Sequence, residues 1–456
     1  MPGADFLQLD PADAPAHGLA DWLTAALRAG VTDGRLPVGT RLPSTRGLAD
    51  QLDLSRGVVV EAYQRLAEEG LVGGRRGGGT TVLATAPPIS RPAGPADTPT
   101  VEIDLSPGLP DLSAFPRQAW LRAERAALSA GTAADLGYGD PRGTPALRTA
   151  LAGWLARSRG VRTVPGEVIV VNGVAQGLAL LMQVLAARGT DTVGFEDPGS
   201  AGTRAQLSRW GMRVQPVPVD EHGVDVAALA GSGLNTVVVT PAHQFPTGVV
   251  LAADRRRALA DWARDGGLVI EDDYDAEHRY DRPPVAALQA TAPDRVAHLG
   301  SVSKTLAPAL RLGWLLAPAE LRDELIERKR WSDITSPALG QLSLAELITS
   351  GGFEKLLRLV RTRQRQRRDA LLDALTRHLP QARVQGVAAG LHLLVTLPGL
   401  DDDRALAAAA REQGVAVHPL SWHRTRPGPP GLVIGYAATT PDRLREAVRR
   451  LAPLVG

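Results

Sequence analysis

The sequence contains no cysteine, and lysine occurs at only three of its 456 positions, Lys304, Lys329 and Lys355. Without cysteine the chain forms neither disulfides nor thiolate metal sites. Its nine histidines include no HExxH pair, so we expect no metal site. All other fixed positive charge is carried by arginine, which stays protonated in proteins, whereas a desolvated lysine releases its proton. The three lysines are therefore the positions where a free amine is available for chemistry.

Long hydrophobic runs are also missing. The longest, around residues 178–187, is interrupted by Gln183 and is too short to span a bilayer. The first sixteen residues carry acidic side chains but no basic segment, unlike a signal peptide. The formal net charge of +2 gives no bulk argument for nucleic acid or a membrane surface. We therefore expect a cytoplasmic protein with no membrane partner.

One segment lacks any hydrophobic periodicity and divides the chain. Residues 83–101 are rich in proline and alanine, which is typical of a semi-extended linker. Short helical patterns precede it, and strand-like apolar runs alternate with longer helical patterns after it. The sequence therefore predicts an N-terminal domain over 1–82, a linker over 83–101 and a larger domain over 102–456.

The larger domain has the pattern of an α/β fold. Continuous apolar runs occur at 167–171, 192–195, 235–240, 267–273 and 295–300, and helical stretches separate them. Such runs indicate a parallel-rich sheet with helices on both faces. Further runs at 391–397, 414–420 and 431–437 follow long amphipathic helices, which predicts a small C-terminal α+β lobe.

Polar residues follow these runs, so they should gather at the carboxyl edge of the sheet, where such folds bind ligands. Around Val174 and Ala175 a strand-to-helix turn offers free backbone N–H groups to a phosphate. Ser301, Ser303 and Arg311 add hydroxyl and guanidinium donors beside it. The sequence predicts a phosphate site at this edge.

Lys304 lies within the same stretch, and Asp272 ends a buried run. An amine for an aldehyde and an anion for a ring nitrogen are the two groups that pyridoxal 5'-phosphate (PLP) requires. Tyr274 is placed to reach the phenolic oxygen of the ring. Taken singly, each is more simply a surface lysine, a paired aspartate or a core tyrosine; together and in this order they favour a PLP site. Lys329 and Lys355 lie in charge-rich stretches, which predicts positions on helix surfaces.

Residues 103–456 resemble the fold-type I aminotransferases, and several motifs are similar to their regulatory MocR branch. These are "SPGLPDLSAFP", "YGDPRGTPALR", "TPAHQFPTG", "EDDYDAEHRYD" and "SVSKTLAPALRLGW". The resemblance implies that Lys304 forms the internal aldimine, Asp272 pairs the pyridine nitrogen and Tyr274 contacts the phenolic oxygen. It assigns the phosphate to Ser301, Ser303, Arg311 and the backbone around Val174 and Ala175. It also implies a head-to-tail homodimer, with Tyr138 reaching the phosphate from a second subunit.

The chain departs from the aminotransferase pattern at three places. Phe245 stands where many enzymes have the asparagine of Asn-Pro-Thr-Gly, and Ser200 where many have an aromatic that covers the ring. Leu432 and Val433 occupy the place of the arginine that grips a substrate carboxylate. Arg424 and Arg426 in the preceding loop are the candidates to replace that arginine.

The N-terminal domain predicts a helix-turn-helix. Helical patterns cover 19–31, 45–53 and 56–70; Ser44 caps the second and Ser55 the third. A glycine-rich hairpin follows, so the segment suits a helix in the major groove with a wing on the backbone. Residues 1–82 contain eight arginines and ten acidic residues, so net charge does not indicate DNA binding. The prediction of DNA binding rests on where the arginines lie. A small helical dimerisation domain is the alternative.

"LPSTRGLA" and "SRGVVVEAYQRLAEEG" resemble the GntR-type winged helix. The expected contacts to double-stranded operator DNA are Arg41, Arg46, Ser55, Arg56, Arg75 and Arg76. Gly57 and Val58 depart from the polar pair usual in that family. The third helix should turn Val59, Ala62, Tyr63 and Leu66 to the core and leave Arg56, Gly57 and Val60 facing outward.

We therefore expect a PLP-binding, sequence-specific transcriptional regulator rather than an enzyme with physiological turnover. Loss of the carboxylate arginine and Ser200 both argue against a gripped amino acid, so PLP is the expected effector and vitamin B6 supply the expected role. A regulator that senses an amino acid or amine through an external aldimine stays open, as does an active aminotransferase. A PLP-binding scaffold without DNA activity has little support, because nothing in the N-terminal domain replaces the DNA function.

Overall fold

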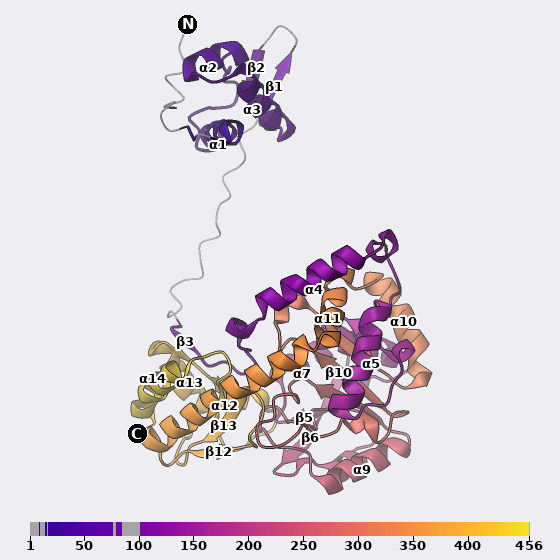
Figure 1. Cartoon of the computed structure of the whole chain (residues 1–456). Helices are drawn as coiled ribbons and strands as arrows, with labels where there is room; N and C mark the ends of the chain where they lie inside the picture. Colours follow the sequence, from indigo (N-terminus) through magenta and orange to yellow (C-terminus); the bar gives the residue numbers. More distant parts are fainter. Residues whose placement is uncertain (1–8, 10–13, 16, 76–78, 84–100, 456) are drawn as a thin grey trace. The chain divides into compact units, whose positions relative to one another are not determined.

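A computed structural model describes residues 9, 14–15, 17–75, 79–83 and 101–455 (Figure 1). It divides into two compact units, residues 1–98 and 99–456, each of which is described by itself. The predicted linker at 83–101 falls almost wholly outside the described residues. None of the described helices is long and apolar enough to cross a membrane.

The N-terminal unit has the order of elements expected of a winged helix. Its helices and hairpin strands are α1 (Leu19–Thr32), α2 (Thr45–Leu52), α3 (Arg56–Glu68), β1 (Val72–Arg75) and β2 (Gly79–Val82). The Ser44 hydroxyl accepts the Gly47 N–H at 3.0 Å and the Ser55 hydroxyl accepts the Val58 N–H at 3.4 Å, so both helices begin where their caps predict. Leucine and valine side chains from all three helices and the wing form one core.

The second unit contains the remaining helices and strands. Its helices are α4 (Arg117–Ala130), α5 (Pro145–Arg159), α6 (Val174–Ala187), α7 (Ala201–Arg209), α8 (Val226–Ala230), α9 (Ala253–Arg264), α10 (Ala319–Asp333), α11 (Ala338–Thr349), α12 (Gly352–His378), α13 (Asp403–Glu412) and α14 (Pro441–Leu451). Its strands are β3 (Ile103–Asp104), β4 (Ile169–Val171), β5 (Thr192–Asp197), β6 (Arg213–Asp220), β7 (Gly223–Val224), β8 (Thr236–Val239), β9 (Leu268–Asp273), β10 (Val296–Ser301), β11 (Gly313–Leu316), β12 (Arg383–Gln385), β13 (His392–Thr396), β14 (Val415–Ala416), β15 (His418–Pro419) and β16 (Leu432–Gly435).

An eight-stranded sheet forms the centre of this unit, in the order β4-β11-β10-β9-β8-β5-β6-β7. Strands β6, β5, β8, β9 and β10 run parallel, whereas β11 and β7 are antiparallel to their neighbours. The five strands predicted from apolar runs are all present, and the parallel-rich α/β class is confirmed. The runs missed β6, in which Pro216 and Pro218 interrupt the apolar pattern, and they missed β7 and β11.

Helices cover both faces of the sheet because its strands are apolar on both sides. In β4, Val170 packs in a cluster with α5, α11 and the start of α12, while Ile169 and Val171 pack on the other side with α6 and α10. Helix α9 covers the first of these faces further along the sheet. Helix α4 lies against α11 (Figure 1).

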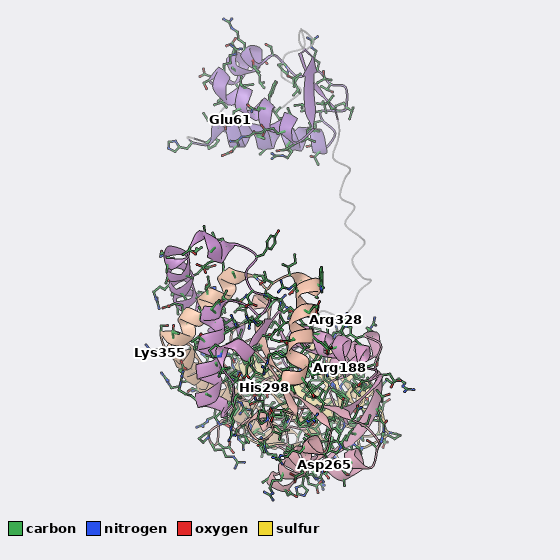
Figure 2. All side chains as sticks on the ribbon, turned by 90° about the vertical axis from the view of Figure 1, so that its right-hand side faces the viewer. Glu61, Arg188, Asp265, His298, Arg328 and Lys355 are labelled. Carbon is green, nitrogen blue, oxygen red and sulfur yellow. The ribbon has the colours of Figure 1, made fainter. Side chains whose placement is uncertain are left out.

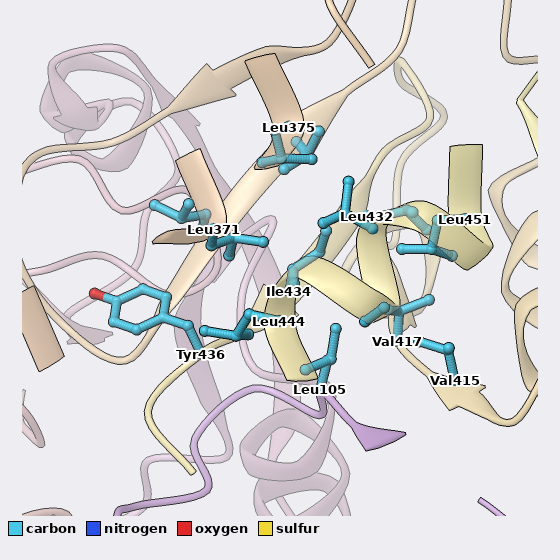
Figure 3. Packing of buried hydrophobic residues seen from close by; sticks show 14 of the residues in the cluster. Leu105, Leu371, Leu375, Val415, Val417, Leu432, Ile434, Tyr436, Leu444 and Leu451 are labelled. Carbon is cyan, nitrogen blue, oxygen red and sulfur yellow. The ribbon is translucent and has the colours of Figure 1, made fainter. Parts of the chain in front are cut away.

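The small lobe is an antiparallel sheet, β12-β13-β16-β15, packed on helices. Figure 3 shows Leu371 and Leu375 of α12 meeting Leu432 and Ile434 of β16 and Leu444 of α14. Strand β3 pairs with β14 of this lobe, so the stretch that follows the linker is anchored there. The predicted C-terminal α+β lobe is therefore present.

Candidate functional site

A cavity of about 300 Å³ opens at the carboxyl edge of the large sheet. It brings together eight residues that the sequence predicted for cofactor binding: Val174, Ala175, Asp272, Tyr274, Ser301, Ser303, Lys304 and Arg311. They come from the ends of β9 and β10, the start of α6 and the loop before β11. The convergence follows from parallel strand order, since each strand ends at the same edge.

Lys304 projects its amine into this cavity, where its Nζ donates a 2.6 Å hydrogen bond to the backbone oxygen of Gly108. Burial lowers the pKa of the Lys304 amine, while the nearby carboxylates of Asp275 and Asp272 oppose this shift. A lowered pKa increases the fraction of free amine, which is the form that condenses with a carbonyl.

The other two lysines differ from each other. Lys355 is exposed on α12, as predicted (Figure 2). The prediction of a surface position for Lys329 was wrong, because its side chain is fully buried. Its Nζ lies 2.8 Å from Asp333 Oδ1, one turn later on α10, and 3.0 Å from Ser336 Oγ. These partners compensate the lost hydration of the ammonium, and neither belongs to the cavity.

Asp272 lies at the end of β9 on the cavity wall. Burial, reinforced by the charge of Asp273, raises the pKa of the Asp272 carboxyl to about 7. Its Oδ1 is buried and has no hydrogen-bond partner within the described residues. A buried acceptor of this kind calls for a donor supplied by a ligand, and a protonated ring nitrogen is such a donor.

The part of the cavity wall formed by the start of α6, Ser301, Ser303 and Arg311 has the features of a phosphate site. Helix α6 begins at Val174 with its free N–H groups directed there, and Gly173 before it has φ +84°. A Cβ at Gly173 would lie 3.1 Å from the Arg311 guanidinium, so this position favours glycine. Arg311 donates to the Asn172 carbonyl and lies beside Ser301 and Ser303 on the cavity wall. Together with the unpaired Asp272 oxygen, these groups fit PLP.

Tyr274 lies just beyond β9, which ends at Asp273, yet it still lines the cavity. Its hydroxyl is 3.2 Å from His243 Nδ1, and that nitrogen is 2.9 Å from Asp275 Oδ2. One ligand atom each of His243, Asp275 and His392 lie within 4.8 Å of one another, the one grouping with metal-ligand spacing found in the described part of the chain. Sequence reasoning missed this cluster because its members lie far apart in the chain.

A buried acid, Glu196 of β5, also lines the cavity and was not predicted. Its Oε2 accepts hydrogen bonds from Thr240 N at 3.1 Å, Thr240 Oγ1 at 2.5 Å and Gln244 Nε2 at 3.2 Å. Burial raises the pKa of the Glu196 carboxyl to about 7 in spite of these bonds. The signal available in the sequence was a charged residue at the end of an apolar run.

The three departures from the aminotransferase pattern are visible in the structure. Phe245 and Ser200 both line the cavity, and the Ser200 hydroxyl caps α7 by accepting the Thr203 N–H at 3.2 Å. Leu432 packs in the core of the small lobe. Val433 forms a small cluster with Leu394 and Leu420, and Phe245 packs against this cluster. No cation occupies this position.

Neither arginine proposed as a substitute lines the cavity. Arg424 donates to the Pro429 carbonyl at 2.5 Å and lines a separate cleft. Arg426 lies 3.4 Å from the Pro216 oxygen, to which its Nη2 donates. The loop that carries them is fixed by Asp197, whose carboxylate accepts the Thr425 N–H at 2.9 Å.

The remaining predicted residues lie outside the cavity. Tyr138 is 77% exposed and does not line the cavity. In the N-terminal unit, Arg46, Ser55 and Arg56 are exposed near the starts of α2 and α3. Arg41 forms a β-bridge with Thr81 of the wing. Arg75 ends β1, and Arg76 lies outside the described residues.

Comparisons with known proteins divide the chain in a similar way. Residues 19–82 match the bacterial regulatory proteins of the gntR family, and residues 100–451 match the aminotransferase class I and II family. The probable rhizopine catabolism regulatory protein MocR of Rhizobium meliloti is 33% identical, over 96% of this chain and 94% of its own. The HTH-type pyridoxine biosynthesis transcriptional regulator PdxR of Corynebacterium glutamicum is 34% identical, over 95% of both chains.

Solved aminotransferases share the fold of the second unit. The kynurenine aminotransferase of Pyrococcus horikoshii is 26% identical with a TM-score of 0.71, covering 77% of this chain and 90% of its own. LysN, the α-aminoadipate aminotransferase of Thermus thermophilus, solved with N-(5'-phosphopyridoxyl)-L-leucine, is 28% identical with a TM-score of 0.70, covering 77% and 92%. This fold implies PLP binding, in agreement with the residues that line the cavity.

Proposed function

The chain belongs to the MocR branch of the gntR-family transcriptional regulators, which join a helix-turn-helix to an aminotransferase class I and II domain, and we propose that it regulates transcription in response to PLP. The observation that carries the proposal is the cavity itself. It combines the amine of Lys304 with the unpaired carboxyl oxygen of Asp272, and it offers no cation for a substrate carboxylate at Val433.

Each residue has a distinct role in this proposal. Asp272 accepts the ring N–H, while Arg311, Ser301, Ser303 and the start of α6 hold the phosphate. Tyr274 donates to the phenolic oxygen, and Lys304 provides the amine that bonds to the aldehyde carbon. When bound, PLP supplies an electrophilic carbonyl and an electron-withdrawing ring.

The composition of the cavity favours PLP over an amino acid as the signal. Among the described residues that line it, Lys304 and Arg311 are the only cations. In this proposal Lys304 bonds to the aldehyde of PLP and Arg311 binds its phosphate. An α-carboxylate in this cavity would have no free guanidinium to pair with. The relative PdxR is named for control of pyridoxine biosynthesis, which supports vitamin B6 supply as the role of this regulator.

The described N-terminal unit supports binding of double-stranded DNA through α3 and the wing, with Arg41, Arg46, Ser55, Arg56, Arg75 and Arg76 as the proposed contacts.

A homodimer is also proposed, with Tyr138 completing the partner's phosphate site. The second unit exposes large apolar side chains that a partner subunit would cover: Leu121, Leu128, Leu136, Trp331, Ile334 and Leu339. Domain limits of 1–82, 83–101 and 102–456 remain part of the proposal.

Active transamination is the second candidate, and the fold shared with enzymes such as kynurenine aminotransferase favours it. It requires a carboxylate clamp, which the cavity does not provide through Arg424 or Arg426. We therefore propose that the site reports ligand rather than turning over substrate. A sensor of an amine that lacks a carboxylate remains compatible with the same cavity.

The experiment is a titration of PLP into cofactor-free protein on a genomic fragment from beside its own gene, with no amino acid present. PLP should change DNA affinity or the footprint, because by linkage DNA and cofactor alter each other's affinity by the same factor. Lys304→Ala should blunt the response, and Lys355→Ala is the matched control. DNA binding that ignores PLP but responds to one amino acid or amine would establish the alternative sensor.

A further inference from the structure

The outward face of α3 has an apolar position where a DNA-reading helix usually carries polar side chains. Four residues of the helix are buried in the domain core: Val59, Ala62, Tyr63 and Leu66. The exposed residues of the helix are Arg56, Gly57, Val60, Glu61, Gln64, Ala67 and Glu68. Val60 is 42% exposed, and it is the large apolar side chain that this helix presents to solvent.

Most polar side chains around Val60 are already engaged. Glu61, labelled in Figure 2, pairs with Arg65 at 2.6 Å, and Arg65 also pairs with Asp21 of α1. Gln64 Nε2 donates to Glu68 at 3.1 Å. Arg56 makes no hydrogen bond or ion pair through its side chain to any residue that the structure describes. The face therefore offers one free cation and one free apolar group to a partner.

Gly57 leaves space beside these two groups. A Cβ at this position would meet nothing closer than the Ser55 hydroxyl, 3.8 Å away. Gly57 and Val60 are three residues apart, so they lie on the same side of the helix in adjacent turns. Because Gly57 has no side chain, base edges can approach the branched apolar side chain of Val60 closely.

We propose that Val60 recognises thymine, by contact with its 5-methyl group in the major groove. The proposal rests on the DNA-binding function proposed above. In that groove the 5-methyl group of thymine is the apolar group that the base edges present, and apolar side chains make contact with it. Arg56, at the start of the helix, anchors the same segment to a phosphate or to a guanine edge. Sequence preference at this point of the operator is therefore carried by a methyl contact rather than by a hydrogen bond.

The test replaces single thymines of the operator with deoxyuridine, which removes only the methyl group. The operator is a half-site selected from random duplexes by the full-length protein. At one thymine of this half-site, replacement by deoxyuridine should weaken binding of the unmodified protein by about fourfold. This is the effect of losing one buried methyl group. Val60→Ala should weaken binding to the thymine operator by a similar factor and should be indifferent to the replacement.

Controls separate this contact from a loss of folding. Val60 is exposed and alanine has the higher helix propensity, so Val60→Ala should keep its thermal unfolding midpoint. Val164→Ala, at an exposed valine of the other unit, should retain the full deoxyuridine effect. If every deoxyuridine affects both proteins equally, or affects neither, Val60 does not read thymine although DNA binding stands. A protein that selects no duplex at all overturns the proposed function, and this inference with it.

Discussion

The amine of Lys304 donates a 2.6 Å hydrogen bond to the carbonyl oxygen of Gly108, a residue 196 positions earlier in the chain. Gly108 has φ +83°, and a Cβ there would lie 3.2 Å from the Lys304 nitrogen. A neutral carbonyl holds the amine in place without fixing its proton as a carboxylate would. The contact therefore keeps Lys304 in the cavity in a form that can react.

This geometry predicts the site of covalent attachment. Protein loaded with PLP and treated with borohydride should carry the label on Lys304, as read by peptide mass spectrometry. Lys304→Ala should lose the borohydride-fixed label, while keeping some cofactor through the phosphate contacts. Label on the buried Lys329 or the exposed Lys355 would show that the site is assigned wrongly.

The affinity for PLP should depend on pH through Asp272. Because burial raises the pKa of its carboxyl to about 7, the group is mostly protonated below that pH in cofactor-free protein. Binding a cationic ring nitrogen favours the carboxylate and releases this proton, so affinity should rise with pH up to about 7. Between about pH 5.5 and 7, a plot of log affinity against pH should be about one unit steeper than for Asp272→Asn. Glu196, Asp275 and Lys304 are common to both proteins, so equal slopes would exclude this role.

A buried ion pair beneath the cavity should be needed for stability. Arg159 Nε lies 2.8 Å from Asp273 Oδ2, with the two side chains 0% and 3% exposed. Arg159→Ala leaves the Asp273 carboxylate buried without its main partner and should cost about 3 to 5 kcal/mol of unfolding free energy in denaturant titrations. Arg213→Ala breaks the exposed pair with Asp191 and should leave the midpoint nearly unchanged, because solvent screens it.

DNA binding should weaken steeply with salt, since neutralised phosphates release counterions. Arg46→Ala and Arg56→Ala should each reduce affinity, and each should lower the log–log salt slope by about one if the guanidinium contacts a phosphate. Fluorescence anisotropy at several salt concentrations measures both quantities. Arg162→Ala, in the other unit, serves as the control. Unchanged binding in both α2 and α3 variants would contradict the proposed DNA-binding surface.

The sequence by itself determined the α/β class and those elements that carry a local signal, which leaves out β6, β7 and β11. Apolar runs predicted β4, β5, β8, β9 and β10, and Ser44 and Ser55 predicted the starts of two helices. These signals are local: a period or a cap acts over a few residues, so it can be recognised without knowing what packs nearby. The residues chosen for the cavity share one edge for the same reason, because strand ends follow from strand order.

Only the tertiary structure decided which charged groups lost their water and what they met. Lys329 was expected on the surface and is buried, because Asp333 and Ser336 compensate its charge. Glu196 lines the cavity, and the only sequence signal for it was a charge at the end of an apolar run. The pair of His243 with Asp275 contacts Tyr274 without lining the cavity, and Arg424 binds the Pro429 carbonyl outside it. Desolvation and pairing depend on side chains from distant segments, and periodicity along the chain carries no information about those neighbours.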